Sequence, residues 1–347
     1  MKNTRTIRPS AQRGMEKVVK FCICSYSIPV IISATLLIAL PGCGAGFAQS
    51  TTLRVGHFPN VTHVQALVAH NFSRRGKGWF EQHFGPGVQI EWFVYNAGPS
   101  AMEAIFADSV DLAYVGPSPA INAYAKARGE DIRIIAGAVE GGAALVVRAD
   151  SGLRAAADFK GKKIATPQLG NTQDIAARAW LSTGGLRITL TGGDAQVVPT
   201  ANPDQLRLFQ QRQLDAVWTV EPWVSRLELE AGGKVLLEQS EAVTTVLVSS
   251  AKFLARQRDL AQRFVLAHEG LTEWIRSNPA EAQAIIREEL AAEMRAEIKP
   301  ALISHAWTRI ILTTAISTNA LKDFVAKAKD AGFLRSAPDL SRLVERP

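Results

Sequence analysis

Short apolar runs alternate with helical patterns along most of this 347-residue chain. A run such as Leu53–His57 has the length and composition of a buried strand, and the stretch from Val61 to Phe72 has the spacing of an amphipathic helix. Similar pairs follow one another up to about residue 242, and from Ala251 to about Ala331 the pattern is helical. This alternation predicts an α/β fold with largely parallel sheets.

Two positions in the alternating pattern indicate a second lobe. The glycine pair Gly141-Gly142 lies between two expected strands, and the apolar run Val243–Val248 comes a hundred residues later. We interpret these as the two crossings between lobes. Residues 143–242 would then form an inserted lobe, and residues 49–142 plus 243–347 would form a discontinuous one. Two such lobes enclose a cleft that can close by hinge motion.

The junctions between strands and helices carry small or polar residues that cap helices, and several carry proline early in the helix. In a parallel α/β sheet these junctions lie at the carboxyl edge of the strands, where ligands bind. Helix N-termini present unpaired N–H groups there and suit an anion without a buried counter-charge. Ser100, Ser118 and Thr172 would add hydroxyl donors. Any single junction is better explained as an ordinary helix cap than as a binding site, so the prediction depends on several junctions converging.

An ordered set of segments spans roughly residues 51–250: Leu53–Gly56, Asn96–Ala101, Asp111–Pro119, Gly161–Thr166, Gly170–Asp174 and Asp215–Trp223. Together these segments resemble the nitrate, sulfonate and taurine class of ABC-transporter substrate-binding proteins. The resemblance implies a type II periplasmic binding protein fold, which consists of two α/β lobes around a cleft. It also implies that a trapped solute is delivered to a membrane permease, while a separate ATPase subunit hydrolyses ATP.

The candidate ligand-binding residues lie at these junctions: Asn60, His63, Gly98, Pro99, Ser100, Gly116, Ser118, Asn171, Thr172, Glu221 and Trp223. We interpret Glu221 first as a helix cap; as a ligand contact it would favour a solute with a cationic group, such as an aminosulfonate. The expected solute is a small anionic or zwitterionic oxyanion such as an aliphatic sulfonate, taurine or nitrate. A binder of an aromatic acid or thiamine precursor, or an enzyme on the same scaffold, stays open as the alternative.

The first 48 residues have the pattern of an export signal. A basic stretch precedes the apolar segment Ser27–Leu40, which is shorter than the roughly 20 residues that a membrane span needs. Gly46–Ala48 offers a signal-peptidase site, whereas Leu40–Cys43 resembles a lipobox that would leave Cys43 as a lipidated N-terminus. Both processing routes stay open, as does translation starting at Met15. Either way we expect a periplasmic or extracytoplasmic protein, with or without a lipid anchor.

Charge and motifs exclude several function classes. Of the net charge of +7, five charges belong to the first 48 residues, so the exported chain is near +2 and a nucleic-acid partner is not expected. All three cysteines, Cys22, Cys24 and Cys43, precede residue 49, which excludes a disulfide in the exported chain. Hydrolase, phosphate-loop and zinc-protease motifs are absent from the sequence, so we expect neither catalysis nor a cofactor.

Histidines crowd the N-terminal third of the exported chain, at His57, His63, His70 and His83. Because no acidic cluster accompanies them in the sequence, we expect no metal site, although His57 and His63 could face the cleft. The stretch Ile286–Glu297 is rich in Ala, Glu and Arg and predicts an exposed amphipathic helix. We expect the protein to be a monomer.

Overall fold

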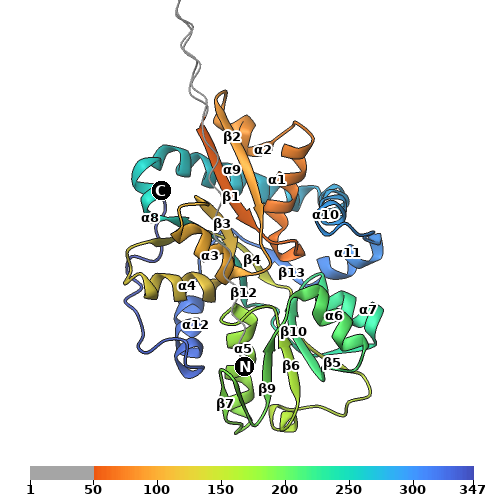
Figure 1. Ribbon diagram of the computed structural model, residues 1–347. Coiled ribbons are helices and arrows are strands. Elements are labelled where there is room, and N and C mark those ends of the chain that lie inside the picture. Colours follow the sequence, from red (N-terminus) through yellow and green to blue (C-terminus); the bar gives the residue numbers. More distant parts are fainter. Residues whose placement is uncertain (1–50) are drawn as a thin grey trace, which may run out of the picture. The chain divides into compact units, whose positions relative to one another are not determined.

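The computed structural model describes residues 51–347 (Figure 1). The predicted signal peptide, both of its processing sites and Cys43 lie outside the described residues. Within residues 51–347, none of the helices is both long and apolar enough to cross a membrane.

Most of the described chain is organised around two mixed sheets, here called sheet A and sheet B. Sheet A has the strand order β13-β4-β12-β3-β1-β2, and sheet B has the order β11-β5-β10-β6-β9. The strands of sheet A are β1 (Thr51–His57), β2 (Val88–Val94), β3 (Leu112–Val115), β4 (Ile132–Gly141), β12 (Val243–Ser250) and β13 (Ile310–Leu312). Those of sheet B are β5 (Ala143–Arg148), β6 (Lys163–Thr166), β9 (Gln196–Pro199), β10 (Ala216–Val220) and β11 (Gly233–Glu238), and β7 (Ile188–Thr189) pairs separately with β8 (Gly192–Gly193).

Helices cover both faces of each sheet. The bounds are η1 (Val61–His63), α1 (Val64–Arg74), α2 (Trp79–Phe84), α3 (Gly98–Phe106), α4 (Pro117–Lys126), η2 (Ala156–Phe159), α5 (Thr172–Thr183), α6 (Asn202–Gln210), α7 (Trp223–Ala231), α8 (Ala251–Arg256), α9 (Arg258–Ser277), α10 (Pro279–Met294), α11 (Pro300–Trp307) and α12 (Thr318–Asp330). Strand alternation distributes the side chains: Leu112 and Tyr114 of β3 pack toward α1 and α9, whereas Ala113 and Val115 pack toward α3 and α4.

The chain passes from sheet A to sheet B at a pair of glycines with positive φ. Gly141 (φ 73°) and Gly142 (φ 71°) separate β4 from β5. A Cβ on Gly141 would lie 2.4 Å from the carbonyl oxygen of Arg309, so both the backbone conformation and the space require glycine. The chain enters sheet B here and returns to sheet A at β12. The division into separate lobes at these points stays a prediction, because residues 51–347 belong to one compact unit.

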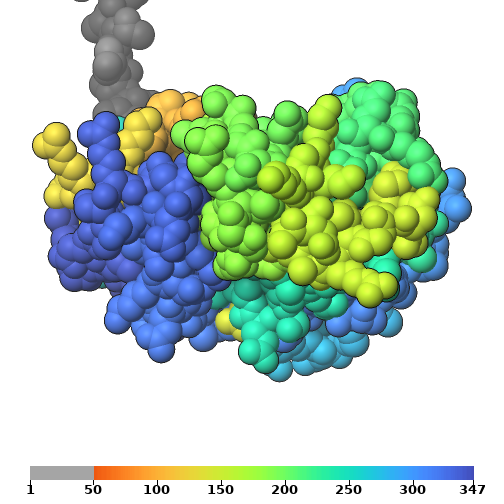
Figure 2. All heavy atoms as spheres, turned by 90° about the horizontal axis from the view of Figure 1, so that it is seen from below, coloured from red at the N-terminus to blue at the C-terminus, as the bar shows by residue number. Residues whose placement is uncertain are grey.

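The last helix, α12, contacts elements that belong to both sheets. It packs on α4, beside sheet A, and on α5, beside sheet B. Figure 2 shows the C-terminal segment, in blue, directly beside the green surface of the sheet B region. Beyond α12, the ring of Phe333 lies 5.9 Å from the guanidinium carbon of Arg178 in α5.

The α/β prediction is confirmed, but the expectation of largely parallel sheets is wrong. In sheet A, β12 is antiparallel to β3 and β4, and in sheet B, β5 is antiparallel to β10 and β11. Parallel neighbours need a crossover connection, usually a helix, within one sheet. Instead, β5 enters sheet B directly from β4 of sheet A, and β12 enters sheet A directly from β11 of sheet B. The sequence patterns also missed α2, β11 and β13.

A buried histidine joins α9 to sheet A. The Nε2 atom of His268 lies 2.9 Å from the carbonyl oxygen of Gly137, and its Nδ1 atom lies 3.0 Å from the hydroxyl oxygen of Tyr114. Because a carbonyl only accepts, Nε2 carries the proton and Nδ1 accepts from Tyr114. The neutral ring therefore satisfies both neighbours, and burial lowers the pKa of His268 to about 4.

We predict that His268 makes stability depend on pH between about 6.5 and 4. As pH falls through this range the unfolded histidine gains a proton before the folded one does, so the free energy of unfolding decreases by up to about 3 kcal/mol. Urea denaturation at a series of pH values measures this decrease. His268→Gln should remove part of it, whereas His83→Gln on the exposed surface should leave it unchanged. An identical pH dependence in both variants would contradict the assignment.

Candidate functional site

A small enclosed cavity lies where the strand–helix junctions of the two sheets meet. Its volume is about 20 Å³. The lining residues are Phe58, Asn60, Thr62, His63, Asn96, Ala97, Gly98, Gly116, Pro119, Pro167, Asn171, Thr172, Gln173, Val220 and Thr244. Within the part of the chain that the structure describes, the lining set contains no Lys, Arg, Asp or Glu. Any attraction for an anion therefore comes from neutral donors and from helix ends.

The start of α5 supplies the most direct donors. Asn171 caps the helix, because its Oδ1 atom accepts a hydrogen bond from the backbone N–H of Asp174 at 2.8 Å. The N–H groups of Thr172 and Gln173 come earlier in the helix and have no intrahelical acceptor. The Thr172 hydroxyl is buried and has no hydrogen-bond partner among the described residues. Buried polar groups are normally paired, so this hydroxyl is a candidate ligand contact.

A buried ion pair fixes the loop before α5. The two carboxylate oxygens of Asp174 accept hydrogen bonds from the Thr166 hydroxyl at 3.0 Å and from the Gly170 N–H at 2.9 Å. Arg178, one turn later, donates from Nε to Asp174 at 3.1 Å. Arg178 thereby neutralises the carboxylate of Asp174 within α5, away from the cavity lining. Sequence reasoning did not single out either residue, although their spacing of four on a helix is a recognisable ion-pair signal.

Two glycines let the opposite walls approach each other. A Cβ on Gly116 would lie 2.3 Å from the Thr172 hydroxyl oxygen, and a Cβ on Gly98 would lie 2.3 Å from Cγ of Pro119. Gly116 precedes α4 of the sheet A region, whereas Thr172 begins α5 of the sheet B region. The close approach across the cavity therefore requires the absence of a side chain at Gly116.

Asn60 is oriented by a tryptophan behind it. The Nε1–H group of Trp223 donates to Oδ1 of Asn60 at 3.1 Å, and Trp223 itself is buried. Because Oδ1 is occupied, the amide nitrogen of Asn60 is the group left to donate. Trp223 was predicted to contact the ligand, but it does not line the cavity and instead positions Asn60.

His63 lines the cavity as a neutral donor. The Phe58 N–H lies 3.4 Å from Nδ1 of His63 and donates to it, so Nε2 carries the ring proton. Burial, and then the neighbouring His57, lower the pKa of His63 well below its ordinary value. His57, the other histidine expected near the cleft, is absent from the cavity lining and faces His70.

Glu221 lies beneath the cavity wall and does not line it. One of its carboxylate oxygens accepts from the Ser225 N–H at 3.1 Å, in the first turn of α7, and the other accepts from Arg309 at 2.9 Å. Burial raises the pKa of Glu221, and the bonds from Ser225 and Arg309 oppose that rise. Both oxygens are engaged, which fits the interpretation as a helix cap.

The predicted ligand-binding residues fall into two groups, those that line the cavity and those that do not. Asn60, His63, Gly98, Gly116, Asn171 and Thr172 come together around the cavity, whereas Pro99, Ser100, Ser118, Glu221 and Trp223 are not among its lining residues. The Ser100 hydroxyl donates to the Ala97 carbonyl at 2.8 Å, a local bond that turns it back into its own helix start. The Ser118 hydroxyl is buried without a partner in the described chain.

Several lining residues were missed although they adjoin predicted ones. Phe58, Thr62, Asn96, Ala97, Pro119 and Gln173 lie at the same junctions, so the sequence indicated these junctions but only some of the residues that line the cavity there. Thr244 belongs to the return strand β12 rather than to a junction. Its hydroxyl oxygen lies 2.5 Å from the Gly141 carbonyl oxygen and 3.2 Å from that of Val139, and nothing in the sequence marks it as a cavity residue.

The model of the NMT1-like family matches residues 46–290. The chain belongs to the NMT1-like family. A Bacillus subtilis (strain 168) protein described as a candidate aliphatic sulfonates-binding protein is 26% identical over 268 residues, which is 73% of this chain and 75% of the relative. A protein of the same description from Escherichia coli (strain K12) is 30% identical over 161 residues, 45% of this chain and 47% of that protein.

Solved structures establish the fold of this NMT1-like protein. The alkanesulfonate-binding protein SsuA from Xanthomonas axonopodis pv. citri, bound to MOPS, has a TM-score of 0.70 at 22% identity and covers 86% of this chain and 99% of its own. The periplasmic nitrate-binding protein NrtA from Synechocystis PCC 6803 has a TM-score of 0.65 at 14% identity, with 84% of each chain covered. The predicted periplasmic binding protein fold is confirmed, as is the resemblance to the nitrate, sulfonate and taurine class.

The buried Glu221–Arg309 pair provides a prediction about stability. Glu221 is 0% exposed and Arg309 is 13% exposed, so Arg309→Met leaves a buried carboxylate without its cation. We expect this to lower the free energy of unfolding by about 3–5 kcal/mol, measured by urea denaturation. Adding Glu221→Gln should restore much of the loss. Arg207→Met, which breaks the exposed pair with Asp204, serves as the control and should cost less than about 1 kcal/mol. Equal losses in the two single variants would contradict the prediction.

Proposed function

We propose that this NMT1-like protein is an extracytoplasmic solute-binding protein of an ABC importer that captures a small oxyanion, with a sulfonate favoured. One observation carries the proposal. The cavity is lined by the start of α5 and by the buried Thr172 hydroxyl, which has no hydrogen-bond partner among the described residues, and none of the lining side chains is charged. The names of the relatives, which refer to alkanesulfonate, aliphatic sulfonates and nitrate, support the same chemical class.

Neutral donors suit an oxyanion for a physical reason. A sulfonate or nitrate has several acceptor oxygens and no proton to donate, so a cavity that offers the N–H groups of Thr172 and Gln173, the Asn60 amide and the Thr172 hydroxyl matches it. The positive end of the α5 dipole adds to the attraction. A fixed cation is unnecessary, and the ion exchanges its hydration shell for these donors as the cleft closes.

Cavity size limits which part of a solute is enclosed. The volume of about 20 Å³ only just exceeds the roughly 10–15 Å³ that one water needs, so in this structure the cavity has no room for a whole organic sulfonate. A second cavity of about 420 Å³ shares Asn96 with the first and is lined partly by Trp223 and Met294. We propose that the organic part of a sulfonate extends in this direction.

The alternative solutes receive less support from the geometry. An aromatic acid or thiamine precursor was expected to use Trp223 and Glu221. The Glu221 carboxylate is already engaged with Ser225 and Arg309, whereas the Trp223 ring lines the cavity of about 420 Å³ and is open to either class of solute. The two relatives are described as binding proteins, which favours a binding function over an enzyme on the same scaffold. The permease, the ATPase subunit and a monomeric state belong to this proposal.

We predict that Thr172→Val weakens binding of ethanesulfonate. Loss of one buried donor should cost about 1–3 kcal/mol, measured by titration calorimetry. The control is Thr183→Val, at the exposed end of the same helix, which should bind as the unmodified protein does. Equal affinity in all three proteins would remove Thr172 from the binding site.

The solute class is tested by thermal melting of the protein with taurine, ethanesulfonate, nitrate, phthalate and a thiamine precursor. A true ligand raises the free energy of unfolding by RT ln(1 + [L]/Kd), so the melting temperature should rise with at least one sulfonate. A rise with phthalate or the precursor alone would favour the alternative solutes. No rise with any oxyanion would overturn the proposed class.

We predict that export processing decides whether the protein is anchored. If the lipobox around Cys43 is used, labelled palmitate will be incorporated into the wild-type protein and not into Cys43→Ser, and the variant will be released from the membrane fraction. If the signal peptidase site after Ala48 is used, both proteins will be unlabelled and equally soluble in the extracytoplasmic fraction.

A further inference from the structure

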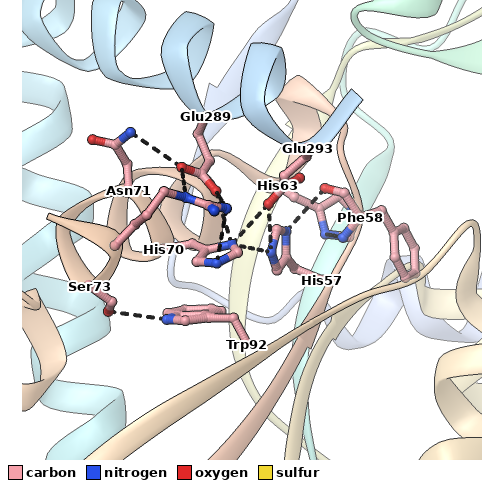
Figure 3. A network of polar contacts seen from close by, with 10 residues as sticks. His57, Phe58, His63, His70, Asn71, Ser73, Trp92, Glu289 and Glu293 are labelled. Atoms are coloured by element: carbon pink, nitrogen blue, oxygen red, sulfur yellow. Dashed lines mark hydrogen bonds and ion pairs between the residues drawn. The ribbon is translucent and has the colours of Figure 1, made fainter. Parts of the chain in front are cut away.

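Outside the small cavity at the strand–helix junctions, a buried cluster brings together side chains from three distant segments (Figure 3). His57 is the last residue of β1, His70 lies in α1, and Glu293 lies in α10. The Nε2 atom of His57 lies 3.1 Å from Nδ1 of His70 and 3.1 Å from Oε1 of Glu293, and the latter two atoms are 2.9 Å apart. The side chains of His57, His70 and Glu293 are only 0%, 14% and 2% exposed.

Ordinary hydrogen bonding satisfies this cluster poorly. Nε2 of His57 and Nδ1 of His70 converge on the same Glu293 oxygen and also face each other, and Nδ1 of His70 lies 3.1 Å from Oε1 of Glu289 as well. The second carboxylate oxygen of Glu293 is buried and has no hydrogen-bond partner in residues 51–347. An unpartnered, buried carboxylate oxygen is costly, and it indicates that a positive group belongs beside it.

We propose that His57, His70 and Glu293 form a binding site for a divalent transition-metal ion, with Zn²⁺ preferred. Two imidazoles and one carboxylate are a ligand set that zinc favours. With metal–ligand distances of about 2.0–2.2 Å, tetrahedral ligands lie about 3.3 Å apart, so the observed triangle needs only small movements. Water would occupy the fourth position.

Neighbouring groups fix the rings in the orientation that coordination needs. The Nδ1 atom of His57 lies 3.3 Å from the Phe58 carbonyl oxygen, so Nδ1–H can donate there and leave the Nε2 lone pair for the ion. The His70 ring stacks on Trp92, with ring centroids 5.3 Å apart. Coordination through Nδ1 of His70 puts the ring proton on Nε2, so the 3.4 Å contact of Nε2 with the Arg74 guanidinium, which only donates, has to open; Arg74 keeps its ion pair with Glu289 at 2.7 Å.

The site has an entry route and a mechanical consequence. Glu293 also lines the cavity of about 420 Å³, through which an ion can reach the cluster. A bound ion would tie α10 to the end of β1, immediately before Phe58, Asn60 and His63 of the solute cavity. This inference does not depend on the proposed solute, because its ligands lie outside the lining of the small cavity.

The proposed metal site also revises two expectations from the sequence. The acidic ligand that seemed to be missing, Glu293, comes from α10, more than 200 residues after His57 and His70. The stretch Ile286–Glu297 was expected to be an exposed amphipathic helix. One face of α10 is exposed, but Glu289 and Glu293 belong to the buried face, where their side chains are 0% and 2% exposed. Both carboxylates lie on the side of α10 that faces α1.

The test measures the metal directly. The untagged exported protein is treated with a chelator, loaded with Zn²⁺, separated from free ion by gel filtration and analysed by mass spectrometry for metal content. We expect one retained zinc per chain and no retained Mg²⁺, because magnesium prefers oxygen ligands. Absence of retained zinc, or equal retention of both metals, would overturn the proposal.

Matched variants locate the ion. His70→Gln and Glu293→Gln should each weaken zinc binding by at least about 100-fold in titration calorimetry, since even outer-shell changes cost 10–100-fold. His83→Gln removes an exposed histidine and should bind zinc unchanged. Circular dichroism confirms that each variant is folded, and the visible spectrum of the Co²⁺-loaded wild type gives a second readout, expected to show nitrogen and oxygen coordination. Equal affinity in all variants, or a loss in His83→Gln, would overturn the site.

Discussion

The buried Asp174–Arg178 ion pair is the interaction on which the candidate site depends. It anchors the loop that leads into α5, through Thr166 and Gly170, while the Asn171 cap leaves the next N–H groups free. The charges needed to order this loop are thus buried behind the cavity and cancel each other. What reaches the cavity is the field of a helix end, which is fixed in direction and does not titrate.

The sequence predicts the fold class well because strand and helix periodicities are local properties. It predicts which junctions surround the cavity for the same reason, since capping residues such as Asn171 are adjacent to the helices they begin. It does not predict which residue of a junction faces inward. Successive residues in the first turn of a helix differ by about 100° in direction, so Gly98 lines the cavity while Ser100 bonds back to its own backbone.

Long-range pairing explains the larger errors. A helix with many glutamates predicts exposure, because isolated carboxylates are costly to bury. In α10 this cost is offset by partners from β1 and α1 that no local pattern associates with it: Arg74 for Glu289, and His57 and His70 for Glu293. The hydrogen bond of Trp223 could not be predicted for a similar reason. Its indole N–H is directed to Asn60, 163 residues earlier in the chain, and this contact depends on the tertiary fold.

The position of α12 has a consequence for movement. This helix packs on α4 and on α5 at once, and Phe333 beyond it lies against Arg178, the residue that neutralises Asp174. Any separation of the two sheets must slide α12 along one of its neighbours or draw Phe333 away from the loop before α5. In the proposed hinge motion the C-terminal segment therefore resists separation of the two sheets, and residues outside the cavity lining help to set how readily they separate.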